Sequence, residues 1–202
     1  MSKFNWTEFN SKPDIIEKLK YCDATLSTLS RKGSSRNVYA LNETQVLKIA
    51  KNKKGIAQCR VEREIWQDMG SYYGDVLAKL FKSDKYDYWC IMERAIPVKD
   101  YDFEKYANYS LRELYDFLIH LDSYSKPSRY KDYKHFIDND MKNMFMEDTF
   151  ARNIYDLSLE ADMPMGDLGK ASSYGKVFRN GEIKIVLIDY GLTWELYDGY
   201  YS

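Results

Sequence analysis

The sequence predicts an α+β fold built in two parts, and three observations support this. The first half of the chain reads mainly as strands, with one long amphipathic helix among them. After Pro97 the apolar residues recur at helical spacing, and a hairpin pattern near residue 180 then interrupts the helices. We therefore expect a strand-rich part over residues 1–97 and a mostly helical part over 98–202.

The first part opens with a helix and a strand pair. A short helix is expected over residues 13–21 (PDIIEKLKY), where a proline precedes apolar residues at helical spacing. Residues 36–41 (RNVYAL) and 45–51 (QVLKIAK) read as two strands, and the turn NET joins them.

A longer helix and a second strand pair follow. The helix is expected over residues 55–70, and Gly70 is expected to end it. Its apolar residues fall roughly on one face: Ile56, Cys59, Ile65, Trp66 and Met69. Residues 76–84 and 87–96 read as the second strand pair.

The second part holds two predicted helices and a hairpin. Residues 110–124 begin with a serine cap and carry leucines at helical spacing. Residues 138–161 read as one further amphipathic helix, and a basic loop over 125–133 separates the two. Residues 175–191 read as the hairpin, because Asn180-Gly181 is the favoured pair for a tight type I′ turn.

Composition excludes several classes of function. The net charge of -1 lacks the basic surplus that non-specific nucleic-acid binding requires. A basic stretch, Lys126–Lys134, carries interleaved tyrosines (Tyr124, Tyr130 and Tyr133), and we favour a solvated surface over a nucleic-acid contact there. No apolar run approaches the roughly 18 residues of a membrane span, so no membrane partner is expected.

Cysteines and histidines indicate a reducing compartment and no zinc. Cys22, Cys59 and Cys90 are odd in number and lack CxxC spacing, so we expect reduced, partly buried thiols in a cytoplasmic protein. The two histidines, His120 and His135, are too few for a histidine-based zinc site.

A few charged residues stand where the apolar pattern would not place them. Lys48 lies within an apolar strand, and Glu62 follows it by 14 residues on the next helix. A buried lysine needs a charged partner, so Glu62 is its candidate; the alternative is that Lys48 points to solvent from an edge strand. Asp189 ends the apolar run 185–188, and Asp167 follows Pro164 and Gly166 in an expected loop.

One lysine, one glutamate and two loop aspartates are the groups that phosphoryl transfer uses. The lysine holds phosphate oxygens, one aspartate holds Mg²⁺, and the other orients the attacking hydroxyl. Magnesium takes few carboxylates plus phosphate oxygens, so the scarcity of histidine and cysteine is no obstacle.

In this order of motifs the chain resembles the protein-kinase-like superfamily, in the compact form seen among phage-encoded and other atypical kinases. The similarity spans residues 24–193 and rests on GSSRNVYAL, VLKIA, VEREIW, CIMERA, GDLGKASSYG and DYG. The resemblance implies a two-lobed fold and a catalytic pair, Asp167 and Lys48. It implies nucleotide contacts from Gly33, Ser34, Ser35, Arg36, Val38, Lys48, Glu62, Met92 as gatekeeper, Glu93 and Ala95. It also implies Mg²⁺ ligands at Asp189 and Ser172.

The chain departs from that family in four places. The loop at 29–37 keeps only Gly33, with Arg36 where a third glycine is expected, and Met165-Gly166 replace an HRD triplet before Asp167. Ser172 stands where the family has a metal-binding asparagine. Eleven residues follow Gly191, so the family's peptide-binding segments are not expected.

Three functions follow from these observations. The first is an ATP- and Mg²⁺-dependent phosphotransferase of atypical kinase type, in the cytoplasm, which is the host cytoplasm if a phage encodes it. The second is a pseudokinase-like binding module that inhibits or scaffolds a protein partner. The third is an unrelated α+β interaction protein. Stabilisation by Mg²⁺-ATP separates the first from the other two.

Overall fold

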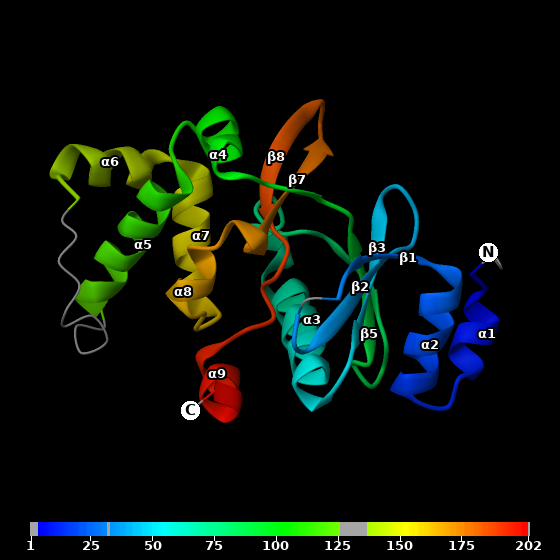
Figure 1. Cartoon of the computed structure of the whole chain (residues 1–202). Coiled ribbons are helices and arrows are strands. Elements are labelled where there is room, and N and C mark those ends of the chain that lie inside the picture. Colours follow the sequence, from blue (N-terminus) through cyan, green and yellow to red (C-terminus); the bar gives the residue numbers. More distant parts are fainter. Residues whose placement is uncertain (1–3, 32, 126–136, 202) are drawn as a thin grey trace. The chain divides into compact units, whose positions relative to one another are not determined.

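The computed structural model describes residues 4–31, 33–125 and 137–201 (Figure 1). It confirms the predicted fold class: α+β, strand-rich first and mostly helical later. The chain divides into two compact units. Unit 1 holds Met1–Gly74, Ala78–Ala95 and Glu195–Ser202, and unit 2 holds Asp75–Leu77 and Ile96–Trp194. Among the described residues, no helix has the length and apolar character to cross a membrane. The basic stretch 126–134 and His135 lie outside the described residues.

Unit 1 is built on a five-stranded antiparallel sheet, in the order β1-β2-β3-β5-β4. Its strands are β1 (Ser27–Ser30), β2 (Arg36–Ala40), β3 (Gln45–Ala50), β4 (Leu80–Ser83) and β5 (Trp89–Glu93). Three of them match the predicted strands closely, whereas β1 was not predicted because STLS carries a single large apolar residue. The helix α9 (Trp194–Tyr201) ends the chain.

The two faces of this sheet differ in character. One face and the helices that cover it, α1 (Trp6–Ser11) and α2 (Ile15–Thr25), form an apolar core. Its fully or nearly fully buried members are Phe9, Tyr21, Cys22, Tyr39, Leu47, Ile49, Trp89 and Ile91. Figure 1 shows α1 and α2 on one side of the sheet and α3 (Lys53–Tyr73) on the other. The α3 face therefore receives the alternate residues of the strands, Lys48 among them.

The helix α3 begins two residues before its predicted start and ends later than expected. The Asn52 side chain accepts a hydrogen bond from the Gly55 N–H at 3.1 Å, which satisfies a first-turn donor. The helix continues through Gly70 to Tyr73, so the prediction that Gly70 ends it was wrong. A glycine inside a helix is tolerated at about 1 kcal/mol, and a Cβ here would lie 3.2 Å from the Trp66 ring.

Unit 2 combines helices with a three-stranded antiparallel sheet. The sheet order is β6-β7-β8, with β6 (Ile96–Pro97), β7 (Tyr174–Arg179) and β8 (Glu182–Leu187). The predicted hairpin is confirmed, because Asn180 and Gly181 join β7 to β8 with φ of 53° and 84°. Both φ values are positive, as a type I′ turn requires. Leu187 also donates its N–H to the Val76 carbonyl at 2.7 Å.

The described helices of unit 2 have at most 15 residues, and some of them have side-chain caps. They are α4 (Asp100–Ala107), α5 (Leu111–Ser125), α6 (Asn139–Glu147), α7 (Thr149–Glu160) and α8 (Met165–Leu168). Ser110 and Glu113 form the predicted serine cap of α5, with Ser110 N–H to Glu113 Oε2 at 2.7 Å. The single helix predicted over 138–161 is wrong: Asp148 adopts extended backbone and caps α7 by accepting from the Ala151 N–H at 2.7 Å. Capping by aspartate competes with helix continuation at this position.

Aromatic contacts and one ion pair organise the interior of unit 2. Phe117 and Phe145 stack with ring centres 4.7 Å apart, which packs α5 against α6. Asp102 on α4 is buried, and its carboxylate binds Lys176 on β7 at 2.8 Å. The ion pair ties α4 to the hairpin sheet.

Candidate functional site

Lys48 lies on β3, in the middle of the sheet face that α3 covers. Its neighbours across the sheet are Val38 on β2 and Cys90 on β5, so these three residues share one face. Only 7% of the Lys48 surface is exposed. Because β3 has a strand on each side, the alternative that Lys48 points to solvent from an edge strand is excluded.

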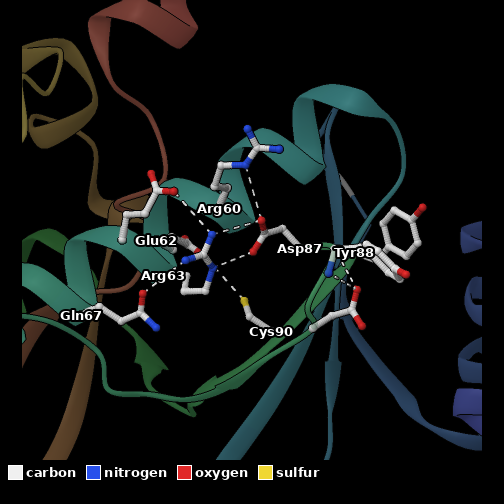
Figure 2. A network of polar contacts seen from close by, with 10 residues as sticks. Arg60, Glu62, Arg63, Gln67, Asp87, Tyr88 and Cys90 are labelled. Carbon is white, nitrogen blue, oxygen red and sulfur yellow. Dashed lines mark hydrogen bonds and ion pairs between the residues drawn. The ribbon is translucent and has the colours of Figure 1, made fainter.

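Glu62 provides the partner that a buried lysine needs. It lies on α3, is fully buried, and its Oε1 is 2.7 Å from Lys48 Nζ. The predicted ion pair is confirmed, and the neighbouring acid on the same helix, Glu64, is half-exposed instead. Figure 2 shows Glu62 on α3 with the Cys90 thiol, which lies 3.7 Å from Oε2.

A second cation shares the same carboxylate. Arg36 at the start of β2 places NH1 2.7 Å from Glu62 Oε2, and Arg36 is 7% exposed. One buried carboxylate therefore meets two buried cations from neighbouring strands. The sequence predicted Arg36 as a phosphate contact, and the structure places its guanidinium against Glu62.

The predicted phosphate loop, Gly33 to Arg36, packs against the beginning of α3. Ser35 is buried, its hydroxyl donates to Gln58 Oε1, and its carbonyl accepts from the Lys51 N–H at 2.7 Å. The Ser34 carbonyl accepts from Asn52 Nδ2 at 3.1 Å. A Cβ on Gly55 would lie 2.2 Å from the Ser35 carbonyl oxygen, so only glycine allows this approach.

The predicted adenine-binding residues lie at the end of β5, the strand beside β3, and directly after it. Met92, the predicted gatekeeper, is buried on the same sheet face as Lys48. The Glu93 N–H donates to the Lys79 carbonyl and the Arg94 N–H to the Thr44 carbonyl, both at 2.8 Å. Ala95 follows, half-buried.

Two buried thiols beside Glu62 have shifted pKa values. Cys59 on α3 and Cys90 are fully buried and hydrogen-bonded to each other. That bond lowers the pKa of the Cys59 thiol, and the charges of Arg36 and Lys48 act in the same direction. The same bond, together with burial, raises the pKa of Cys90.

In unit 2 the predicted catalytic aspartate is placed on a helix. Asp167 lies on the one-turn helix α8, so the prediction that it stands in a loop was wrong. Pro164 and Met165 start this turn, and Met165 and Leu168 bury its apolar side. The Asp167 carboxylate, 29% exposed, contacts the Lys170 ammonium, which is 60% exposed. Lys170 was not singled out from the sequence, although its i,i+3 spacing from Asp167 could have indicated it.

Backbone ties join this helix to the chain before Asp189. The Ser173 hydroxyl donates to the Asp167 carbonyl at 2.7 Å, and the Ser173 carbonyl accepts from the Ile188 N–H at 2.8 Å. Ser172 is exposed in the 3₁₀ turn Ala171–Ser173, and Asp189 is exposed directly after Ile188. Ser173 therefore connects the segments that carry the predicted catalytic aspartate and the predicted metal ligand. Within the described ranges, no three His, Cys, Asp or Glu side chains form a ready-made metal cluster.

Comparisons with known proteins do not assign the chain to a family. No protein-family model matches the chain, and no curated protein matches it. Among solved structures, the ternary complex of streptomycin, ATP and APH(2″)-IIa is similar at 16% identity, covering 95% of this chain and 73% of that chain, with a TM-score of 0.35. A likeness of that size does not show what this chain binds, so the function must be inferred from its own residues.

Proposed function

We propose that the chain binds a nucleoside triphosphate with Mg²⁺ and transfers its terminal phosphoryl group to a hydroxyl acceptor, as an atypical kinase-like phosphotransferase. The observation that carries the proposal is the fully buried ion pair of Lys48 and Glu62 at 2.7 Å, on the strand and helix that the kinase-like resemblance names.

The energetics of the pair support a functional reading. A buried ion pair adds little stability over apolar residues of the same volume, because both charges must leave water. A second buried cation, Arg36, on the same carboxylate makes the arrangement costlier still. Such a cluster is well suited to an anionic ligand: Glu62 orients Lys48, and Lys48 can hold phosphate oxygens.

The residues from Met92 to Ala95, at the end of β5 and directly after it, support adenine recognition. With the Glu93 and Arg94 N–H groups donating to protein carbonyls, adenine would meet the backbone carbonyls here and the Ala95 N–H. Met92 and Val38 would offer apolar contact to the base from the Lys48 face.

The residues of unit 2 would perform the transfer. Asp167 would accept the proton of the acceptor hydroxyl while that oxygen bonds to the terminal phosphorus and the nucleoside diphosphate departs. Lys170, in contact with Asp167, would place a positive charge near the transferred phosphoryl group.

The donor set fits magnesium held mainly by phosphates. Mg²⁺ commonly takes one or two carboxylates and completes its shell with phosphate oxygens and water. Asp189 supplies an exposed carboxylate at the end of a buried strand, and Ser172 a neutral hydroxyl. When bound, Mg²⁺ would neutralise charge that develops on the phosphate oxygens.

Thermal unfolding with and without ligand tests the proposal. Mg²⁺-ATP at a hundred times its dissociation constant should stabilise the wild type by about 2.7 kcal/mol, and Lys48→Ala should abolish the shift. Tyr39→Phe, on the opposite face of the sheet, serves as control and should keep it. No shift of the wild type with any nucleoside triphosphate would contradict the proposal.

One observation favours the binding module as second candidate. Arg36 occupies one oxygen of Glu62, and Ser35 is buried under the first turn of α3, so the loop that would cover phosphates is engaged by protein groups. In that case the same nucleotide series would give no shift, and a protein partner would bind the wild type and Lys48→Ala equally.

A further inference from the structure

The turn between β4 and β5 carries a charge cluster that the nucleotide proposal does not use. Asp87 is 5% exposed, and Figure 2 shows Arg60 and Arg63 reaching it from α3. Arg63 Nε lies 2.8 Å from Oδ1 and its NH2 3.3 Å from Oδ2, while Arg60 Nε lies 3.4 Å from Oδ2. Arg63 therefore binds both carboxylate oxygens of Asp87, which fixes the orientation of the two side chains as well as their distance.

The turn itself presents Asp87 in a set conformation. Asp87 has φ of 59°, a left-handed conformation that aspartate tolerates better than most residues. Its N–H donates to the Asp84 carbonyl at 3.1 Å, and Asp84 Oδ2 accepts from the Tyr86 N–H at 3.0 Å. The Tyr88 carbonyl accepts from the Ala50 N–H at 2.9 Å, which ties the turn to the end of β3.

The cluster joins α3, which carries Glu62, to the turn before β5, the strand that pairs with β3. Arg60 and Arg63 flank Glu62 on α3, and Asp87 precedes Cys90, the cross-strand neighbour of Lys48, by three residues. The helix is thus fastened to the sheet at two places, by Glu62 to β2 and β3 and by Arg63 to the β4–β5 turn. Rotation of α3 that would take Glu62 away from Lys48 must also break the two-point contact of Arg63 with Asp87.

We propose that Asp87 is a positioning residue, which holds α3 through Arg63 so that Glu62 meets Lys48. The effect on nucleotide binding rests on the proposed function; the effect on α3 does not. Arg60 is 58% exposed, so its share is small, and Arg63, 25% exposed, carries the contact.

Thiol labelling of the folded protein tests the hold on α3 directly. Cys59 on α3 and Cys90 beneath it are fully buried, as is Cys22 on the opposite face of the sheet. Asp87→Asn should speed labelling of Cys59 and Cys90 by about tenfold while Cys22 keeps its wild-type rate. Arg63→Gln should do the same, and Arg63→Lys, which keeps charge without the fork, should fall between.

General destabilisation predicts a different pattern. It would raise the labelling of all three thiols together, and that result, like unchanged rates of Cys59 and Cys90, would overturn the proposal. Tyr39→Phe, which removes the 2.8 Å hydrogen bond to Asp23 on the α2 face, is the matched control and should spare Cys59 and Cys90.

A double-mutant cycle connects the positioning role to nucleotide. Asp87→Asn should weaken Mg²⁺-ATP binding about tenfold in the wild type and not further in a Glu62→Gln background, because Asp87 acts through Glu62. Equal weakening in both backgrounds would overturn the route through Glu62. A wild type that binds no nucleotide would contradict the proposed function alone, and the thiol rates would still decide the role of Asp87.

Discussion

The groups that we assign to binding and to chemistry differ in how the protein holds them. In unit 1, Lys48, Arg36 and Glu62 are buried and come from two central strands and a long helix. In unit 2, Asp167 is partly exposed on the one-turn helix α8, and Lys170 after that helix and Asp189 are exposed. Removing one member of a buried ion pair leaves the other charge buried without a partner, which destabilises the fold. Exposed charges can be changed with little effect on the fold. The first group should therefore matter for stability as well as for binding, whereas Asp167 and Lys170 should matter for turnover alone.

The largest expected effect is at Glu62. Glu62→Ala leaves Lys48 and Arg36 buried without their shared carboxylate, and we expect a loss of roughly 3–5 kcal/mol in unfolding free energy. Urea denaturation monitored by tryptophan fluorescence measures it. A loss below about 1 kcal/mol would contradict this prediction, because the buried charges of unit 1 would then matter no more for stability than the exposed charges of unit 2.

The next largest effect is expected at Gly55. A Cβ there would lie 2.2 Å from the Ser35 carbonyl oxygen, so Gly55→Ala must displace backbone, and overpacking typically costs about 1–3 kcal/mol. Gly199→Ala is the matched control, because a Cβ on this helical glycine meets nothing within 4 Å. The control should be neutral or gain up to about 1 kcal/mol; equal behaviour of the two variants in the same denaturation series would show that the loop does not pack on α3.

How far the sequence could predict this structure depends on the kind of signal. The strands β2 and β3 and the hairpin at Asn180-Gly181 were predictable, since alternation and turn chemistry are local. The ion pair of Lys48 and Glu62 was predictable because a lysine inside an apolar strand needs a partner.

Other features depend on contacts that no local pattern shows. The first helix α1 is held by packing on the rest of unit 1, and the strand β1 is held by its pairing with β2. The break at Asp148 arises because capping outweighs an apolar stripe that continues past it. The same holds for the site. Arg36 was selected as a phosphate ligand, but its approach to Glu62 depends on the pairing of β2 with β3. Asp87 and Arg63 are far apart in sequence and meet only through the β4–β5 turn.

A smaller effect, dependent on pH, tests whether unit 2 also relies on a buried charge. The hydrogen bond from Lys176, with that from the Lys99 N–H, lowers the folded-state pKa of Asp102. A lowered carboxyl pKa stabilises the fold above the ordinary aspartate value of about 3.9, and that stabilisation disappears as the pH falls through the folded-state pKa. The difference in unfolding free energy between wild type and Asp102→Asn should be constant near neutral pH and shrink below about pH 4. A difference independent of pH would mean that the ion pair adds no stability.

The smallest effect is expected at Asp167. Its ion pair with Lys170 is solvent-exposed, so Asp167→Asn should change the unfolding free energy by no more than about 0.5 kcal/mol. Thermal denaturation of this variant beside Lys170→Gln checks it. A large loss of unfolding free energy in both variants would contradict this prediction, because the pair would then support the fold as the buried charges of unit 1 do.

Calorimetric titration of Mg²⁺-ATP into two variants tests the central claim most directly. Lys48→Ala removes the charge that would hold phosphate and should weaken binding by at least about tenfold. Asp167→Asn should bind within about twofold of the wild type and lose only phosphoryl transfer, since a charge that faces the acceptor adds little to ground-state binding. Equal affinities of Lys48→Ala and the wild type would contradict the account, because the buried pair would then have no part in nucleotide binding.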